Sequence, residues 1–221
     1  TMAECMLKLL KKNGTIIIEV QYLLNTLQDL TFDNIYHEHY NYWSLTSLVT
    51  FFNKFNAIIY KAERINTHGG SLRIYLKKEP KTKIEKSVKD ILKLEDKFGM
   101  KNFKTYTNFA KKVYKIRSIV RGNILKMKKN NMKIIGYGSP AKATTALNFF
   151  GISNEIDYIV EDNKLKHGKF LPGMRIPIKS KKDIKDKPDC ALVLAWNFFD
   201  EIKRKNSDLA DKIMSIKDLE I

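Results

Sequence analysis

Residues 132–151 read MKIIGYGSPAKATTALNFFG, and this stretch decides the fold of the second half of the chain. Its mostly apolar start, with two adjacent isoleucines, is typical of a buried strand. Gly136 and Gly138 then predict a tight turn, and the residues after them predict a helix that ends at Gly151. A strand, a glycine turn and a helix in this order are typical of a nucleotide-binding α/β unit.

Two more strands are predicted downstream. Residues 156–160 and 190–194 are short apolar runs, and a helix is predicted after the second run, over about 198–205. Short strands that alternate with helices favour a parallel sheet. We therefore expect residues 132–221 to form a Rossmann-like α/β domain.

The glycine turn by itself leaves two interpretations open. It lacks the third glycine of the dinucleotide fingerprint, because Ala141 or Lys142 stands there. Backbone N–H groups at the helix start could hold a phosphate, and Lys142 could add a positive charge. Asp162 lies 24 residues after Gly138, where a ribose-binding acid would fall, but it fits a loop residue equally well. One alternative is therefore a stand-alone module that binds a nucleotide such as NAD(P).

The first block, residues 1–76, predicts the end of another α/β domain. A helix-like stretch at 2–12 is followed by a glycine turn and a β-branched run at 15–20, which predicts a buried strand of the parallel type. A second strand is predicted at 72–76. Because a domain is not expected to start with half of a repeat, and Thr1 is not an initiator methionine, we expect a fragment whose first strands are missing.

Residues 77–131 predict a helical connector. Apolar side chains recur every three or four residues between 103 and 127, and a similar pattern covers 84–98. Residues 77–133 hold 19 basic and 5 acidic side chains, which is +14 of the net charge of +17. Only six of the 41 basic residues in the chain are arginine, the side chain best suited to bidentate readout of bases and phosphates. We therefore expect a solvated helix surface and no nucleic-acid partner.

Composition excludes several classes of protein. An apolar fraction of 43% excludes a disordered chain. The longest apolar runs are far shorter than the roughly 20 residues that span a bilayer, so no membrane partner is expected. No secretory signal opens the chain, and two cysteines, Cys5 and Cys190, are too few for a disulfide framework or a four-cysteine zinc site. A reducing, cytoplasmic location is expected.

The residues richest in chemistry form the motif YHEH, which starts at Tyr36. In a helix Tyr36 and His39 would share a face, and in an extended segment His37 and His39 would. A histidine titrates near neutral pH and suits general acid–base catalysis, and a neighbouring Glu or Tyr could orient it. A polar surface turn is the alternative. No metal site is expected, because the histidines need a third ligand and only His68 or Glu19 is near in sequence.

A second polar motif, HGGSLR, covers residues 68–73. Its two glycines allow close approach of the backbone to a ligand, and Arg73 could clamp an anion. A hairpin turn with a solvated arginine fits the motif as well.

Together, these motifs resemble a known family. The stretch FDNIYHEH at 32–39, with Tyr42 and the Ser-Leu pairs at 44–45 and 47–48, looks like the core signature of the S-adenosylmethionine-dependent sugar C-methyltransferases. These enzymes act on nucleotide-linked 4-keto-6-deoxyhexoses. Further segments resemble the rest of the family pattern in the same order: HGGSLR at 68–73, GYGSPAK at 136–142, Leu147-Asn148, Gly151, Asp162-Asn163, Pro172-Gly173 and LAWNF at 194–198.

The resemblance implies a protein of three parts. These are a cysteine-rich zinc-binding module, a central domain that binds the methyl donor S-adenosylmethionine, and a C-terminal Rossmann-like domain. This chain resembles the tail of the central domain and the C-terminal part. Its sequence holds neither the zinc module nor the glycine-rich donor loop. We therefore expect the chain alone to bind no methyl donor and to be inactive.

The resemblance also implies a mechanism. A base removes the acidic proton beside the 4-keto group of the sugar, and the resulting enolate attacks the methyl group of the donor. By motif match, His39 is the expected base, Tyr36 is the second choice or the enolate stabiliser, and Glu38 orients or binds the sugar. The glycine turn would face the nucleotide diphosphate. The expected substrate-binding residues are His37, Tyr42, His68, Arg73, Gly136, Gly138, Lys142 and Asn197.

Overall fold

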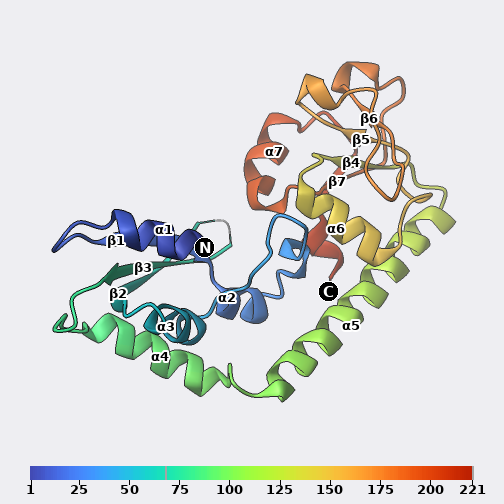
Figure 1. Cartoon of the computed structure of the whole chain (residues 1–221). Helices are drawn as coiled ribbons and strands as arrows, with labels where there is room; N and C mark the ends of the chain where they lie inside the picture. The colour runs from blue at the N-terminus through green and yellow to red at the C-terminus, as the bar shows by residue number, and fades with distance from the viewer. Residues whose placement is uncertain (68, 221) are drawn as a thin grey trace. The chain divides into compact units, whose positions relative to one another are not determined.

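The computed structural model describes residues 1–67 and 69–220 and divides them into two compact units, which can be followed along the chain in Figure 1. Unit 1 consists of Thr1–Thr31 and Tyr40–Phe109. Unit 2 consists of Phe32–His39 and the chain from Ala110 onward. The YHEH motif therefore belongs with the C-terminal part of the chain, whereas the sequence alone assigns it to the block 1–76.

Unit 1 is built on three strands. Its elements are α1 (Met2–Leu9), β1 (Ile16–Gln21), α2 (Leu23–Gln28), α3 (Leu45–Asn53), β2 (Ile58–Ile65), β3 (Ser71–Lys77), α4 (Lys86–Phe98) and the first part of α5 (Phe103–Lys129). The sheet order is β1-β3-β2, and β3 runs antiparallel to both of its neighbours. Helices α3 and α4 pack on β2, as Figure 1 shows.

Strand β1 corrects an expectation from the sequence. The run at 15–20 predicts a parallel strand that is buried, yet β1 pairs antiparallel with β3, and its residues alternate between half-buried and exposed. Ile17, for example, is 58% exposed. The cause is topological, because β3 returns from β2 and inserts beside β1, which lies at one end of the described sheet. A β-branched run favours an extended backbone but specifies neither its direction nor its neighbours.

A buried carboxylate ties three segments of unit 1 together. Glu95 on α4 is fully buried and accepts a hydrogen bond from the Tyr22 hydroxyl at 2.9 Å. It also accepts bonds from the backbone N–H groups of Leu45 and Thr46 at 2.6 and 2.9 Å, and from the Thr46 hydroxyl at 2.6 Å. These N–H groups lie in the first turn of α3, where the helix dipole favours a negative charge. Helix α4 is thus part of the unit 1 core, although the sequence alone assigns it to a connector.

Unit 2 contains the parallel sheet. Its elements are the short 3-10 helix η1 (Phe32–Asn34), the later part of α5, β4 (Ile134–Tyr137), α6 (Ala141–Phe150), β5 (Ile159–Val160), η2 (Lys164–Lys166), β6 (Ile178–Lys179), η3 (Lys181–Asp183), β7 (Cys190–Val193), η4 (Trp196–Phe198), α7 (Phe199–Lys205), β8 (Lys212–Ser215) and η5 (Ile216–Leu219). The five strands are parallel, in the order β6-β5-β4-β7-β8. This confirms the expected Rossmann-like α/β fold.

The strand order reverses at β4. From β4 the chain builds outward through β5 to β6 on one side, and β7 and β8 lie on the other side. In open α/β sheets, ligands bind in the crevice beyond the carboxyl ends of the two strands at such a reversal. Here the turns after β4 and β7 approach closely, because a Cβ built on Gly138 would lie 3.2 Å from the Cβ of Ala195. The φ angle of Gly138, +83°, also favours glycine.

The lysine-rich helix α5 is amphipathic, as its sequence predicts. It exposes most of its lysines and buries an apolar stripe formed by Val113, Ile116, Val120 and Ile124. Within the described ranges, no helix combines the length and the apolar character needed to cross a membrane.

Glu95→Ala is expected to destabilise unit 1 by about 2–4 kcal/mol, because it leaves two hydroxyls and two helix N-terminal N–H groups without their acceptor. Hydrogen-exchange mass spectrometry across a urea series measures this effect, because peptides from α3 should exchange at a lower urea concentration than in the wild type. Glu85→Ala is the matched control, since Glu85 is exposed at the start of the same helix and makes no side-chain cap within the described chain. Equal opening of α3 in both variants would contradict the role of Glu95.

Candidate functional site

The YHEH motif forms a tight turn in unit 2, which is the backbone conformation of the polar-turn alternative and neither a helix nor an extended segment. The His39 backbone N–H donates to the Tyr36 carbonyl at 3.0 Å. The Tyr36 ring packs edge-on against the His39 ring, with centroids 4.8 Å apart, and its centroid lies 6.0 Å from that of His37. The turn thus gathers a phenol and two imidazoles in one place.

The environment of Tyr36 disfavours deprotonation of its hydroxyl. Partial burial and the charge of the neighbouring Glu38 carboxylate, to which the hydroxyl donates a hydrogen bond, raise the pKa of Tyr36 above its ordinary value. The Asp33 carboxylate acts in the same direction. A tyrosine that keeps its proton at neutral pH can donate a hydrogen bond to a developing oxyanion.

The residues just before the motif anchor it to elements that follow β4 and β7. The Phe32 ring packs on Phe149 and Phe150 of α6, with centroids 5.0 and 5.7 Å apart. The Asp33 carboxylate is 4% exposed and accepts a hydrogen bond from the Trp196 indole N–H at 2.6 Å. Helix α6 follows β4 and Trp196 follows β7, so the motif lies at the carboxyl edge of the sheet where the strand order reverses.

A cavity of about 380 Å³ lies beside the motif. Most of its lining is apolar and a few polar groups converge on it, which is typical of a small-molecule site. The YHEH turn, the turn after β4 and the loops around β5 and β6 all contribute to this lining. The lining residues are Tyr36, His37, Ser139, Ala141, Thr144, Lys166, Lys169, Phe170, Leu171, Pro172 and Ile178.

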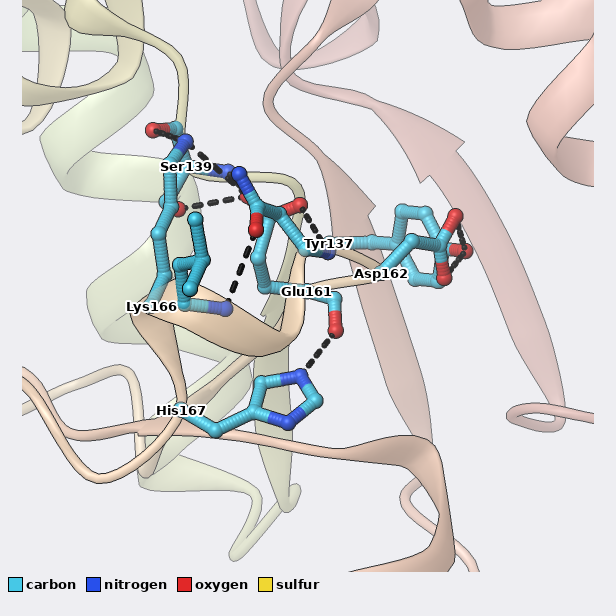
Figure 2. Close-up of polar contacts among 8 residues, drawn as sticks. Tyr137, Ser139, Glu161, Asp162, Lys166 and His167 are labelled. Carbon is cyan, nitrogen blue, oxygen red and sulfur yellow. Dashed lines mark hydrogen bonds and ion pairs between the residues drawn. The ribbon is translucent and has the colours of Figure 1, made fainter.

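A carboxylate fills part of the turn after β4, as Figure 2 shows. Glu161 accepts hydrogen bonds from the Ser139 backbone N–H at 2.9 Å and from the Ser139 hydroxyl at 2.6 Å. The Asn163 N–H donates to it at 3.1 Å, and the Lys166 ammonium lies 3.4 Å away. Burial alone would raise the pKa of Glu161, but these donors and the lysine charge outweigh it and lower the pKa to about 2. An N–H group of the glycine turn is therefore already taken by an anion of the protein itself.

The candidate ribose-binding acid also has an internal partner. The Tyr137 hydroxyl lies 2.8 and 2.9 Å from the two carboxylate oxygens of Asp162, and the Asn206 amide donates to the same hydroxyl at 3.1 Å. Burial and the bond to Asp162 raise the pKa of Tyr137 to about 12. Asp162 thus binds the side chain of Tyr137, the last residue of β4 (Figure 2). This contact gives Asp162 a structural role as the alternative to ribose binding.

The structure gives two residues of the glycine segment surroundings within the protein itself. A Cβ on Gly136 would come within 2.9 Å of Leu194 and 3.0 Å of Ile159 side-chain atoms, so the sheet itself needs glycine there. The Lys142 ammonium is buried and lies 5.0 Å from the centre of the Trp196 ring. Burial lowers the pKa of Lys142, and the Asp33 charge opposes that shift. Substrate contacts of Gly136, Gly138 and Lys142 stay predictions.

The other predicted site residues belong to unit 1 or lack a described side chain. Arg73 forms an ion pair with Glu19 at 2.8 Å, so its guanidinium already has a carboxylate partner. Tyr42 is half-buried in unit 1. His68 lies outside the described residues, and so does the side chain of Asn197.

Three residues of the site, Asp33, Glu161 and Trp196, are not among the site residues predicted from the sequence. Glu161 follows a predicted strand and stands directly before Asp162, so its position was a usable clue. Asp33 and Trp196 are 163 residues apart, and no spacing rule connects them. In the part of the chain that the structure describes, no group of three or more His, Cys, Asp or Glu residues could hold a metal ion.

Glu161 is expected to contribute about 3 kcal/mol to the stability of unit 2 at neutral pH. Its folded-state pKa of about 2 lies below the ordinary value of 4.5. The contribution is therefore present above the ordinary pKa and is lost as the pH falls toward the folded-state pKa. Urea unfolding from neutral to acidic pH should show a smaller acid-induced loss of stability in Glu161→Gln than in the wild type. Glu155→Gln, on the loop before β5, is the matched control, and a wild-type slope in Glu161→Gln would refute this role.

Comparison with known proteins agrees with these observations. Residues 66–215 match the sequence model of a family described as the C-methyltransferase C-terminal domain. The chain is also 33% identical over 197 residues to the C-methyltransferase NovU of Streptomyces niveus, an alignment that covers 88% of this chain and 47% of NovU. The chain thus spans about half the length of the curated relative it matches. It belongs to the C-methyltransferase family and represents the C-terminal portion of such a protein.

Proposed function

We propose that the complete protein is an S-adenosylmethionine-dependent C-methyltransferase that acts on a nucleotide-linked 4-keto-6-deoxy sugar of the dTDP type. In this proposal, the present chain supplies the proton-transfer residues and a cavity for the substrate. By itself it transfers no methyl group.

One observation carries the proposal: Tyr36 and His37 of the YHEH turn line the same cavity as Ser139 and Ala141 of the turn after β4. The His39 ring packs on that of Tyr36 and is not itself among the lining residues. The carboxyl edge of a parallel sheet, next to a glycine turn, is where such folds bind nucleotides. A phenol and two imidazoles beside that edge supply groups for moving a proton. A substrate that joins a nucleotide to a sugar with an acidic C–H bond would use both features.

The proposed roles follow from the chemistry of the turn. His39 is the base that removes the proton from the carbon next to the keto group. The enolate oxygen then carries negative charge and needs a hydrogen-bond donor. The raised pKa of Tyr36 disfavours the phenolate that a tyrosine base would need, so the proposal gives Tyr36 the donor role. Glu38 accepts a hydrogen bond from the single hydroxyl proton of Tyr36 in the present chain. In this proposal the enolate oxygen replaces Glu38 as the acceptor of that proton.

The nucleotide part of the substrate is assigned to the rest of the cavity. Lys169 and Phe170 are exposed residues of its lining, and they offer an ammonium group for a diphosphate and a ring for a base. The proposed contacts of Tyr42, His68, Arg73 and Asn197 with the substrate rest on the family resemblance alone.

A stand-alone NAD(P)-binding module is the second candidate, and the turn after β4 argues against it. A dinucleotide fingerprint offers N–H groups of its glycine turn to the pyrophosphate and a carboxylate to the ribose. Here the Ser139 N–H donates to Glu161, and Asp162 is bonded to Tyr137.

The methyl donor is assigned to a part of the complete protein that this chain does not supply. The donor would provide the electrophilic methyl carbon. As far as it is described, unit 1 has an antiparallel sheet and contains no glycine-rich turn between a parallel strand and a helix, so its residues do not fit a donor cradle. Zinc is proposed only for the separate cysteine-rich module that the resemblance implies.

In the complete protein, His39→Gln is expected to lower kcat by about 10²–10⁴-fold, because it removes the base. Tyr36→Phe should lower kcat by about 10–100-fold with little change in KM, because the donor acts mainly on the developing charge. The assay incubates the protein with S-adenosylmethionine and a dTDP-4-keto-6-deoxyhexose and measures the mass gain of one CH₂ group. Ile35→Val, at an exposed position beside the motif, is the control, and full turnover in His39→Gln would rule out this base.

Ligand binding to the present chain separates the two candidate functions. Calorimetric titration is expected to show saturable binding of dTDP, no comparable binding of NAD⁺ or NADP⁺, and no methyl transfer when donor and sugar are added. Lys169→Glu should weaken dTDP binding by about tenfold through charge reversal. Lys185→Glu, at an exposed site elsewhere in unit 2, is the matched control. Tight NAD(P) binding without dTDP binding would favour the alternative.

A further inference from the structure

We propose that Asp33 and Trp196 are positioning residues, that their hydrogen bond sets the location of the YHEH turn, and that Lys142 supplies the charge that balances Asp33. The catalytic consequence rests on the proposed function. The structural part concerns unit 2 alone and can be tested without turnover.

Asp33 is an unusual carboxylate. It is 4% exposed, and its Oδ2 accepts the Trp196 indole N–H at 2.6 Å. Its Oδ1 is buried and has no hydrogen-bond partner among the described residues. Burying a half-satisfied carboxylate is costly unless a nearby cation compensates. The site therefore needs a positive charge.

Two ammonium groups lie over the indole that Asp33 holds. Lys142 Nζ is 5.0 Å and Lys217 Nζ is 5.1 Å from the centre of the Trp196 ring. Lys217 already pairs with Glu220 at 3.3 Å. Lys142 Nζ is buried without a hydrogen-bond partner in the described chain. Burial lowers the pKa of Lys142, and the Asp33 charge opposes that shift. Lys142 is thus the cation left to balance Asp33.

This arrangement also strengthens the bond that holds the turn. A cation over an aromatic face is attracted by the ring, and it polarises the indole toward a stronger N–H donor. The donor then meets a charged acceptor, which makes the Asp33–Trp196 bond a charge-assisted one. A positioning role also explains why Lys142 is buried and is not among the residues that line the cavity.

The bond is coupled to the reacting groups by a short, internally bonded segment. Asp33 lies in η1, three residues before Tyr36. The Ile35 N–H donates to the Phe32 carbonyl at 2.9 Å, and the Tyr36 N–H donates to the Asn34 carbonyl at 3.1 Å. These backbone bonds connect η1 to the YHEH turn. A displacement of Asp33 would therefore move Tyr36 relative to the cavity.

Hydrogen exchange on the present chain tests the positioning directly. Trp196→Phe keeps an aromatic ring beneath Lys142 but removes the N–H donor. Peptides that cover residues 32–39 should exchange about tenfold faster or more, while the β4 and β7 peptides stay protected. Trp43→Phe replaces the other tryptophan of the chain, in unit 1, and should leave residues 32–39 unchanged. Unchanged exchange of 32–39 in folded Trp196→Phe would overturn the proposal.

A spectroscopic variant covers the case in which Trp196→Phe fails to fold. The chain has two tryptophans, so its ¹H–¹⁵N spectrum has two indole N–H signals, and Trp43→Phe assigns them. Asp33→Asn retains the shape and an acceptor oxygen but removes the charge, and it should move the Trp196 signal upfield. Asp186→Asn, at a side chain that is 86% exposed, should not. An unmoved Trp196 signal in Asp33→Asn would contradict the charge-assisted bond.

Kinetics of the complete protein test the catalytic consequence. Trp196→Phe should lower kcat by about tenfold or more and leave the KM of the sugar nearly unchanged, because the turn is misplaced while the cavity persists. A loss confined to KM would contradict positioning. If the wild-type protein methylates no nucleotide sugar, the proposed function fails, and the exchange and spectroscopic results still decide whether the bond positions the turn.

Discussion

The reversal of strand order between β4 and β7 is the constraint on which the candidate site depends. It brings the turn after β4 against the turn after β7 and leaves an edge where distant segments meet. At this edge the Phe32 ring packs on α6, and the Asp33 carboxylate accepts a hydrogen bond from Trp196. The YHEH turn is consequently held by a rigid parallel sheet, although its own residues form a surface turn.

Internal carboxylates accept N–H groups of the kind that bind anions in other proteins. In unit 1, Glu95 accepts the first N–H groups of α3, and in unit 2, Glu161 accepts the Ser139 N–H of the glycine turn. The strand–turn–helix pattern looks the same whether its N–H groups face a ligand or a side chain of the protein. For this reason, we assign the substrate to the adjacent cavity and not to a dinucleotide cradle.

In the proposed mechanism, the phenol and the imidazole of the YHEH turn divide the chemistry between them. Burial and the Glu38 carboxylate keep the Tyr36 proton in place, so the phenol suits stabilisation of an oxyanion. His39 packs against that ring, and the proposed mechanism gives it the role of base. The family resemblance gives His39 as the expected base and Tyr36 as the second choice, and the raised pKa of Tyr36 favours the same order.

Local pattern was sufficient for the Rossmann-like sheet, for the long amphipathic helix α5 and for the family, because each depends on periodicity or on ordered motifs within short windows. Local pattern did not predict the antiparallel direction of β1 or the existence of strand β2. It also did not predict that Phe32–His39 belongs to unit 2. Nor could it pair Asp33 with Trp196 or distinguish Glu161 from Asp162 as the residue that fills the turn. Those features were decided by tertiary structure, because they arise from contacts between residues far apart in sequence that only the folded sheet brings within hydrogen-bonding distance.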